Sequence, residues 1–306
     1  MNSTLHYHIA AAAKLAQGSS RKRHSNTSNS GDIEQHIESA LELSGIENAL
    51  QHEPIRTIHH LSCTGGTLFA KCIASMPNVL VLNEVNLHSE LTPAHRGRPG
   101  FTPTDMVSLL KQGDRRVSSD IITRLFLSDL ELLREEQWRI GRHIVLRDHS
   151  HSHFLTGPEI SKAPLLQELV ASKFPTLSIV TVRDPIDSYT SMEKQDWLKH
   201  FSPSTFEAYC ERYLAFLDAH ESANIFKYED FLENPKQIMP AIAQALRLKY
   251  FEGFEEVFSN FRFSGDSGRG GTTIAPRPRR PIDPGIEAEM LECSSYKCIA
   301  LRLGYL

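Results

Sequence analysis

The chain has 306 residues, of which 40% are hydrophobic and 23% are charged, a composition typical of a soluble globular protein with a sizeable core. Its net charge of −4 argues against general binding to nucleic acid or to a membrane surface, and no run approaches the ~20 apolar residues of a membrane span. Its five cysteines lack CxxC spacing, which predicts neither a disulfide framework nor a cysteine zinc site and favours a reducing, cytoplasmic setting.

Two segments depart from the acidic average. Residues 1–30 contain four basic residues and no acidic one, and the polar, serine-rich stretch 17–31 is typical of a flexible segment. Residues 262–280 contain five arginines and one aspartate. We predict a flexible basic N-terminal arm over residues 1–31 and a single domain over residues 32–306, which opens with a helix over residues 32–49.

Short apolar runs alternate with helical patterns along the rest of the chain. The runs lack regular polar alternation, as expected of strands that are buried on both faces of a parallel sheet. They span residues 55–61, 79–82, 143–146, 177–182 and 224–226. Helices are predicted over residues 66–75, 118–139, 163–174, 185–198, 204–219 and 235–246, with a closing helix over residues 286–303. This order predicts an α/β fold, a three-layer parallel sheet of about five strands flanked by helices.

The loop after the first strand reads Ser-Cys-Thr-Gly-Gly-Thr over residues 62–67. Gly65 and Gly66 allow a tight turn whose N–H groups point inward, and the following helix adds a partial positive charge. Thr64 and Thr67 add hydroxyl donors, so the loop predicts an anion site, with a plain strand-to-helix turn as the alternative. A GxxxxGK[ST] nucleotide loop is excluded because no lysine precedes the helix. A cysteine-phosphatase loop is excluded because Phe69 stands where an arginine would hold the phosphate.

Arg183 ends the fourth predicted strand, and Ser191 follows eight residues later, about two turns into the next helix. Ligands bind at the carboxyl ends of strands in open α/β sheets, so both side chains are expected at that edge. An arginine fork beside a hydroxyl suits a phosphate group. The alternative interpretation is a salt bridge between Arg183 and Asp184.

These two motifs, in this order, resemble those of the P-loop sulfotransferases, which use 3′-phosphoadenylyl sulfate (PAPS). The segment 228–232, Tyr-Glu-Asp-Phe-Leu, together with Pro235, is similar to a further motif of that family. The resemblance spans roughly residues 55–280 and suggests a divergent, bacterial-type member. It implies that the loop binds the 5′-phosphosulfate and that Arg183 and Ser191 bind the 3′-phosphate. The implied cofactor-binding residues are Cys63, Thr64, Gly65, Gly66, Thr67, Leu68, Arg183, Ser191, Tyr228 and Arg269.

The sequence departs from the family at three places. Cys63 stands where the loop usually carries a lysine that assists the leaving group, and Leu68 stands where many members have an aromatic residue. The C-terminal Arg-Lys-Gly signature is replaced by the arginine-rich stretch 262–280. In that stretch, Arg269 or the arginines at 277–280 are expected to cover the phosphates of the nucleotide.

Sulfuryl transfer needs a base for the acceptor hydroxyl and positive charge near the leaving phosphate. Arg147 and His149 end the third strand, where many members of the family have Lys-Thr-His. The resemblance thus implies His149 as the base and Arg147 as an electrostatic helper. Glu84, at the end of the second strand, is a second base candidate, with a salt bridge to an arginine as its alternative role. His59 and His60 are expected to be structural.

Three alternating histidines, His149, His151 and His153, also fit a metal site, because residues two apart on a strand share a face. No carboxylate or cysteine obviously completes such a set in the sequence, so no metal is predicted.

The leading hypothesis is a PAPS-dependent sulfotransferase that acts on a hydroxyl or amine of a small-molecule or glycan acceptor, without a metal, a nucleic-acid partner or a membrane span. A kinase-like phosphotransferase is disfavoured, because the fourth strand ends in Arg183 rather than in an aspartate for magnesium. A catalytically silent nucleotide-binding protein stays open, because Cys63 occupies the position of the usual lysine.

Overall fold

The computed structural model describes residues 50–88, 106–107, 110, 117–264, 272–276 and 278–306. The predicted arm over residues 1–31, the helix predicted over residues 32–49, and both Arg269 and Arg277 lie outside these ranges. Residues 52–306 group into one unit. The domain boundary at residue 31 stays a prediction.

A parallel sheet of five strands forms the centre of the fold, as predicted. The strands lie in the order β2-β3-β1-β4-β5, and each pair of neighbours is parallel. Their bounds are β1 Ile55–His60, β2 Val79–Val85, β3 His143–Asp148, β4 Thr176–Val182 and β5 Asn224–Lys227. β1 is buried along its whole length, which explains why its sequence lacks clean alternation, although only Ile55 and Ile58 of its six residues are apolar.

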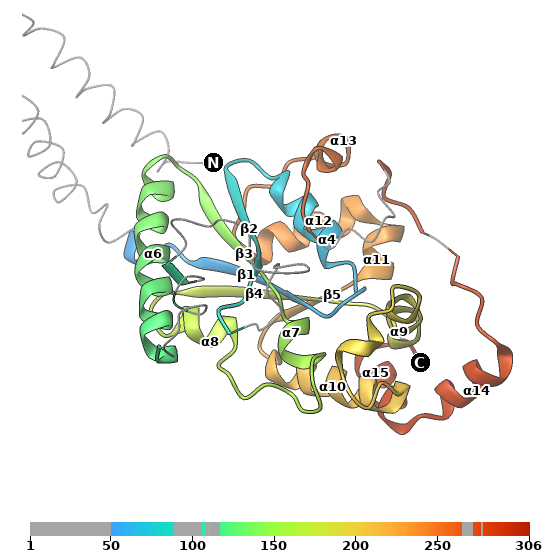
Figure 1. The fold of residues 1–306 in the computed structure, drawn as a ribbon. Helices are drawn as coiled ribbons and strands as arrows, with labels where there is room; N and C mark the ends of the chain where they lie inside the picture. Colours follow the sequence, from blue (N-terminus) through green and yellow to red (C-terminus); the bar gives the residue numbers. More distant parts are fainter. Residues whose placement is uncertain (1–49, 89–105, 108–109, 111–116, 265–271, 277) are drawn as a thin grey trace, which may run out of the picture. The chain divides into compact units, whose positions relative to one another are not determined.

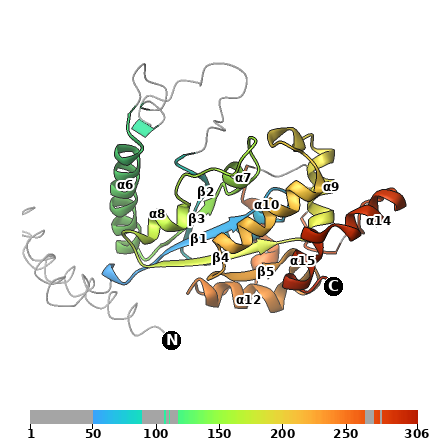
Figure 2. The ribbon, with the colours of Figure 1, turned by 90° about the horizontal axis from the view of Figure 1, so that it is seen from below.

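Helices cover both faces of the sheet, which confirms the three-layer arrangement (Figure 1). One face packs against α4 (Gly66–Ala74) and α12 (Pro235–Ala245). The other face packs against α6 (Ser119–Arg139), α8 (Leu166–Ala171), α10 (Phe206–Ala219) and α15 (Ser294–Leu303). Figure 2 shows α10 lying across the strands. The shorter elements are α7 His151–Phe154, α9 Pro185–Lys194, α11 Tyr228–Glu233, α13 Phe254–Val257, α14 Pro284–Glu292, and the 3₁₀ turns η1 Leu198–His200 and η2 Phe258–Asn260.

Alternation along the strands separates the polar residues of the sheet into two groups. His60 of β1 contacts Arg147 of β3 on the α4 face. His59, which precedes His60, and Asp148, which follows Arg147, contact each other on the opposite face, which α10 covers. Successive side chains of a strand point to opposite faces, so these two pairs cannot share one site.

Two local predictions are wrong. The closing helix is broken at Cys293, whose extended backbone (φ −60°, ψ 124°) ends α14, and whose sulfur accepts a hydrogen bond from Tyr296 N at 3.4 Å to start α15. The histidines at 151 and 153 lie in α7 and not on a strand, because β3 ends at Asp148 and the chain turns there. The argument that they share a strand face therefore fails.

Candidate functional site

The loop between β1 and α4 turns sharply at two residues with left-handed backbone. Cys63 has a φ of 63° and Gly65 a φ of 90°, a conformation that glycine adopts without strain and cysteine does not. The helix begins at once, since Leu68 N donates to Gly65 O at 2.8 Å. Thr64 donates its hydroxyl to Leu61 O at 2.8 Å, so its single proton is used inside the loop.

Both glycines of the loop lie against aromatic rings. A Cβ at Gly65 would lie 2.3 Å from Cδ2 of Tyr228, and a Cβ at Gly66 would lie 2.2 Å from Cγ of His60. Glycine is required here because any side chain would collide with these rings. The close approach also places Tyr228 against the loop.

Replacement of Gly66 by alanine is expected to displace the His60 ring and to lower the free energy of unfolding by about 1–3 kcal/mol. Urea unfolding of Gly66→Ala, His60→Ala and the double variant tests this cause. The cost of Gly66→Ala should shrink in the His60→Ala background, because the ring that the new methyl group meets is gone. Equal costs in both backgrounds would show that His60 is not the obstacle.

The guanidinium of Arg147 joins β3 to the loop. The residue is 2% exposed, and it donates Nη2–H to Thr67 Oγ1 at 3.0 Å and Nε–H to His60 Nε2 at 2.9 Å. His60 Nδ1 donates to Leu61 O at 3.0 Å, which leaves Nε2 as an acceptor. Burial and the nearby charge of Arg147 lower the pKa of His60 to about 3, so this ring stays neutral and keeps its acceptor.

A second set of contacts joins the same guanidinium to β2 and to the segment after η2. Nη1 of Arg147 lies 2.7 Å from Glu84 Oε1, 2.6 Å from Asn83 Oδ1 and 3.1 Å from Ser264 O. Asn83 in turn donates to Ser264 Oγ at 2.6 Å. These contacts hold the buried positive charge of Arg147 beside the loop. The loop itself has Cys63 at the position where a lysine would supply a positive charge.

Glu84 lies at a bulge near the end of β2. Its φ of 55° is uncommon for a residue other than glycine, and the register between β2 and β3 shifts between Leu82 and Val85. One carboxylate oxygen pairs with Arg147, and the other, Oε2, lies 3.5 Å from His149 Nε2. The salt bridge predicted as an alternative role of Glu84 is therefore present, and it fixes the carboxylate next to His149.

His149 follows β3 directly, and its side chain is 16% exposed. Its ring packs edge-on against His151, with 3.7 Å between the ring centroids. Burial lowers the pKa of His149 below that of a free histidine, and the charge of Glu84 acts in the opposite direction. A neutral imidazole next to a carboxylate can accept a proton from a hydroxyl.

The structure brings together the three residues predicted to be catalytic, Glu84, Arg147 and His149. It also places potential metal-ligand atoms of Glu84, His149 and His151 within 4.8 Å of one another. Glu84 is therefore the carboxylate that completes a set with these two histidines, which the sequence alone did not reveal. His153 is not part of this group, and its ring packs against Phe154 with 4.7 Å between centroids.

Arg183 contacts the loop at Cys63. Its Nη1 donates to Ser191 Oγ and to Cys63 O, both at 3.2 Å, and its guanidinium lies 5.3 Å from the centroid of the Tyr228 ring. The structure thus brings together the two residues predicted to bind the 3′-phosphate. Asp184, the alternative partner of Arg183, instead pairs with Arg279 at 2.7 Å.

The described arginines at 279 and 280 differ in their surroundings. Arg279 pairs with three carboxylates, those of Asp184 at 2.7 Å, Asp187 at 3.0 Å and Glu287 at 3.3 Å. Arg280 has a buried Nε and Nη1 that make no hydrogen bond within the described part of the chain. The charge of Arg279 is therefore balanced by acidic partners, whereas these two nitrogens of Arg280 are unpaired within the described residues.

Sequence reasoning missed several residues of the site. His60, expected to be structural, accepts a hydrogen bond from Arg147, and both Asn83 and Ser264 hold the same guanidinium. Tyr213 fixes the backbone of Arg183, because its hydroxyl accepts from Arg183 N at 3.2 Å and donates to Arg183 O at 2.9 Å. Asn83 had one signal, its place beside Glu84 at a strand end. The others had none.

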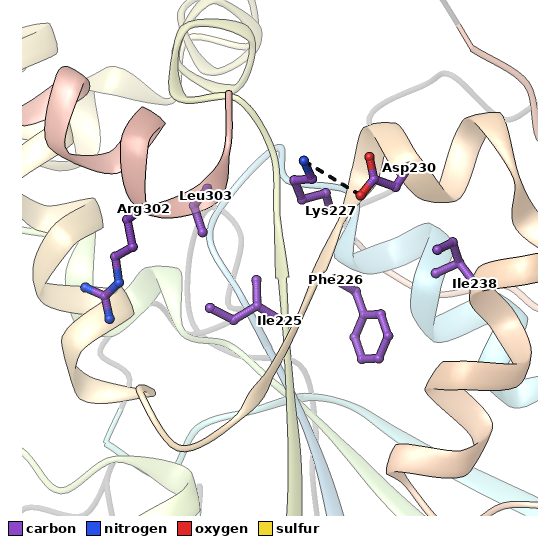
Figure 3. A pocket seen from close by; sticks show the side chains of 7 residues that line it. All are labelled: Ile225, Phe226, Lys227, Asp230, Ile238, Arg302 and Leu303. Carbon is purple, nitrogen blue, oxygen red and sulfur yellow. Dashed lines mark ion pairs between the residues drawn. The ribbon is translucent and has the colours of Figure 1, made fainter. Parts of the chain in front are cut away.

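A pocket of about 300 Å³ opens at strand β5 (Figure 3). It is lined by Ile225, Phe226, Lys227, Asp230, Ile238, Arg302 and Leu303, none of which is a predicted site residue. Lys227 lies 3.8 Å from Asp230, and Arg302 pairs with Asp218, so both cations already have acidic partners.

Over the described ranges, the helices lack the combination of length and apolar character needed to cross a membrane.

Comparisons with known proteins give matches only among solved structures. No protein-family model and no curated protein matches the chain. The sulfotransferase domain of the Synechococcus PCC 7002 olefin synthase is 14% identical with a TM-score of 0.44, over 83% of this chain and 95% of that one. A sulfotransferase from Alicyclobacillus acidocaldarius is 13% identical with a TM-score of 0.39, over 78% and 90%.

Proposed function

We propose that the protein is a sulfotransferase that moves a sulfuryl group from PAPS to a hydroxyl or amine of a small-molecule or glycan acceptor. The observation that carries this proposal is the contact of the loop with two guanidinium groups. Arg147 bonds to Thr67, near the start of α4, and Arg183 bonds to Cys63, near the end of β1. Two positive charges beside one such loop suit a ligand that carries phosphate groups at two positions.

The partners of each arginine suggest which group it would bind. Arg183 donates a hydrogen bond from Nη1 to Ser191 Oγ and would hold the 3′-phosphate. Arg147 bonds to Thr67 in the first turn of α4 and would face the 5′-phosphosulfate. There it would supply the charge that a loop lysine supplies in the family, since Cys63 carries none.

The reaction would form a bond between the acceptor oxygen and sulfur while the bond between sulfur and the leaving phosphate oxygen breaks. His149 would take the proton of the acceptor hydroxyl. Glu84, with Oε2 at 3.5 Å from His149 Nε2, would balance the charge of the resulting imidazolium. Arg147 would stabilise the negative charge that develops on the leaving phosphate. This scheme does not require a metal.

Calorimetric titration with adenosine 3′,5′-bisphosphate, the product nucleotide, tests the proposed site. We expect this nucleotide to bind ~100-fold more tightly than adenosine 5′-phosphate, because only the bisphosphate can pair with Arg183 and Ser191 through charge-assisted hydrogen bonds. Equal affinities would contradict the assignment of Arg183. Tighter binding of ATP with magnesium would favour a phosphotransferase. Tight binding of the bisphosphate, without sulfuryl transfer from PAPS to any acceptor in a panel, would favour a silent nucleotide-binding protein.

A further inference from the structure

Three polar side chains meet on the face of the sheet that α10 covers, opposite to Arg147. His59 lies on β1, Asp148 is the last residue of β3, and His220 caps the C-terminus of α10. They are 0%, 2% and 1% exposed. One potential metal-ligand atom from each lies within 4.8 Å of the others, and the two imidazole rings are 4.4 Å apart. The proposed sulfuryl transfer uses none of these side chains.

Two atoms of this group are buried acceptors without a donor. His220 Nδ1 faces Phe216 O at 2.8 Å, so it carries the proton of the neutral ring and leaves a lone pair on Nε2. Asp148 Oδ2 accepts from Ser150 Oγ and from His59, whereas Oδ1 accepts from no group. Within the described residues, neither His220 Nε2 nor Asp148 Oδ1 has a hydrogen-bond partner. A buried lone pair without a partner is costly, and a cation or a proton donor would remove that cost.

Each member of the group also has an outer partner that fixes its orientation. The Nδ1–H of His220 donates to a backbone carbonyl, that of Phe216, and Ser150 Oγ donates to Asp148 at 2.7 Å. His59 Nε2 lies 2.8 Å from Thr57 Oγ1, which lies 2.8 Å from Ser178 Oγ on β4. Metal-ligating histidines usually donate their second N–H to a carbonyl, carboxylate or similar acceptor. Both histidines therefore have the outer partner that a metal ligand needs.

His59 can serve as a ligand by a change of tautomer. In the present arrangement its Nδ1 lies 2.8 Å from Asp148 Oδ2 as a hydrogen-bond partner. A metal ion at Nδ1 requires the other tautomer of the neutral ring, in which the single proton lies on Nε2 and is donated to Thr57 Oγ1, whose own proton can go to Ser178 Oγ. Ligand atoms around a tetrahedral zinc ion lie roughly 3.3 Å apart, so the side chains need to close by no more than ~1.5 Å.

We propose that His59, Asp148 and His220 supply three of the four ligands of a tetrahedral zinc site that ties β1, β3 and α10 together. Two imidazoles and one carboxylate are ligands that zinc accepts in tetrahedral sites. The three ligands come from distant parts of the chain, and Asp148 directly precedes His149. The ion would therefore fix the end of β3 from the face opposite to the proposed transfer site. This inference does not depend on the proposed function.

The test measures zinc content and zinc affinity of the full chain. Wild-type protein that has been stripped with a chelator and then dialysed against Zn²⁺ should retain one ion per chain by elemental analysis, and Co²⁺ in its place should give the visible absorption of a tetrahedral site. In His220→Leu, which places an apolar side chain in the buried position, the affinity for Zn²⁺ should fall by at least ~100-fold. In Thr57→Val, which removes an outer partner only, it should fall by ~10- to 100-fold.

His151→Ala is the matched control, because it disrupts the other group of potential ligands, Glu84, His149 and His151. This variant should keep the zinc of the wild type. Wild-type protein that binds no zinc would overturn the proposal, and so would loss of zinc in His151→Ala together with its retention in His220→Leu. If His220→Leu does not fold by circular dichroism, the wild-type stoichiometry and Thr57→Val decide the question.

Discussion

Replacing Arg183 with alanine is expected to weaken binding of adenosine 3′,5′-bisphosphate by ~100-fold or more, because charge-assisted hydrogen bonds to a phosphate are among the strongest single contacts in a binding site. Arg183→Lys keeps the charge but loses the planar fork, so we expect an intermediate loss of ~10-fold. The measurement is calorimetric titration of each variant with the bisphosphate and with adenosine 5′-phosphate. Affinity for the monophosphate should change far less, because it lacks the 3′-phosphate.

Arg302→Ala is the matched control for this series. Arg302 is an arginine on α15 whose contacts are with α10, where it pairs with Asp218 and donates to Leu217 O. The Arg302→Ala variant should bind the bisphosphate as the wild type does. Unchanged affinity in Arg183→Ala would rule out this arginine as the anchor of the 3′-phosphate. A similar loss in Arg302→Ala would show that the effect is one of overall charge and not of the site.

The strands and the edge that carries the site could be predicted because both depend on general rules. Burial of a parallel strand on both faces favours apolar side chains, which marked β4 in the sequence, whereas β1 is buried throughout with only two apolar residues, Ile55 and Ile58. The carboxyl ends of parallel strands meet at one edge, which predicted that Arg183 would lie near the loop at Cys63. The two residues are separated by 120 positions in the chain, yet their side chain and carbonyl are 3.2 Å apart.

The contacts within that edge could not be predicted, because each depends on a local backbone choice. Glu84 reaches Arg147 from a left-handed residue at a bulge, and a glutamate in the sequence does not signal either feature. His60 becomes a neutral acceptor only because its other nitrogen meets the carbonyl of Leu61. His151 lies in α7 because the chain turns after β3, so the alternation of side chains along a strand cannot predict where its ring lies.

The variant His149→Ala, which removes the imidazole, is expected to lower the rate of sulfuryl transfer by ~10²- to 10⁴-fold, the usual contribution of a general base. Binding of adenosine 3′,5′-bisphosphate should stay within about threefold of the wild type, because the 3′-phosphate is assigned to Arg183 and Ser191 and not to His149. The measurement is transfer from PAPS under saturating nucleotide, with binding measured separately. Glu84→Gln is the companion variant, since it keeps the size of the side chain and removes its charge.

The pH dependence separates the two candidate bases. Burial lowers the pKa of His149, so the neutral, proton-accepting ring is present throughout the neutral range and is lost only when the pH falls through this lowered pKa. The wild-type rate should therefore hold a plateau at neutral pH and fall below the ordinary histidine range. His149→Ala should lose that acidic limb along with its rate. If Glu84→Gln abolishes transfer while His149→Ala retains both the rate and the limb, then Glu84 is the base and His149 only positions it.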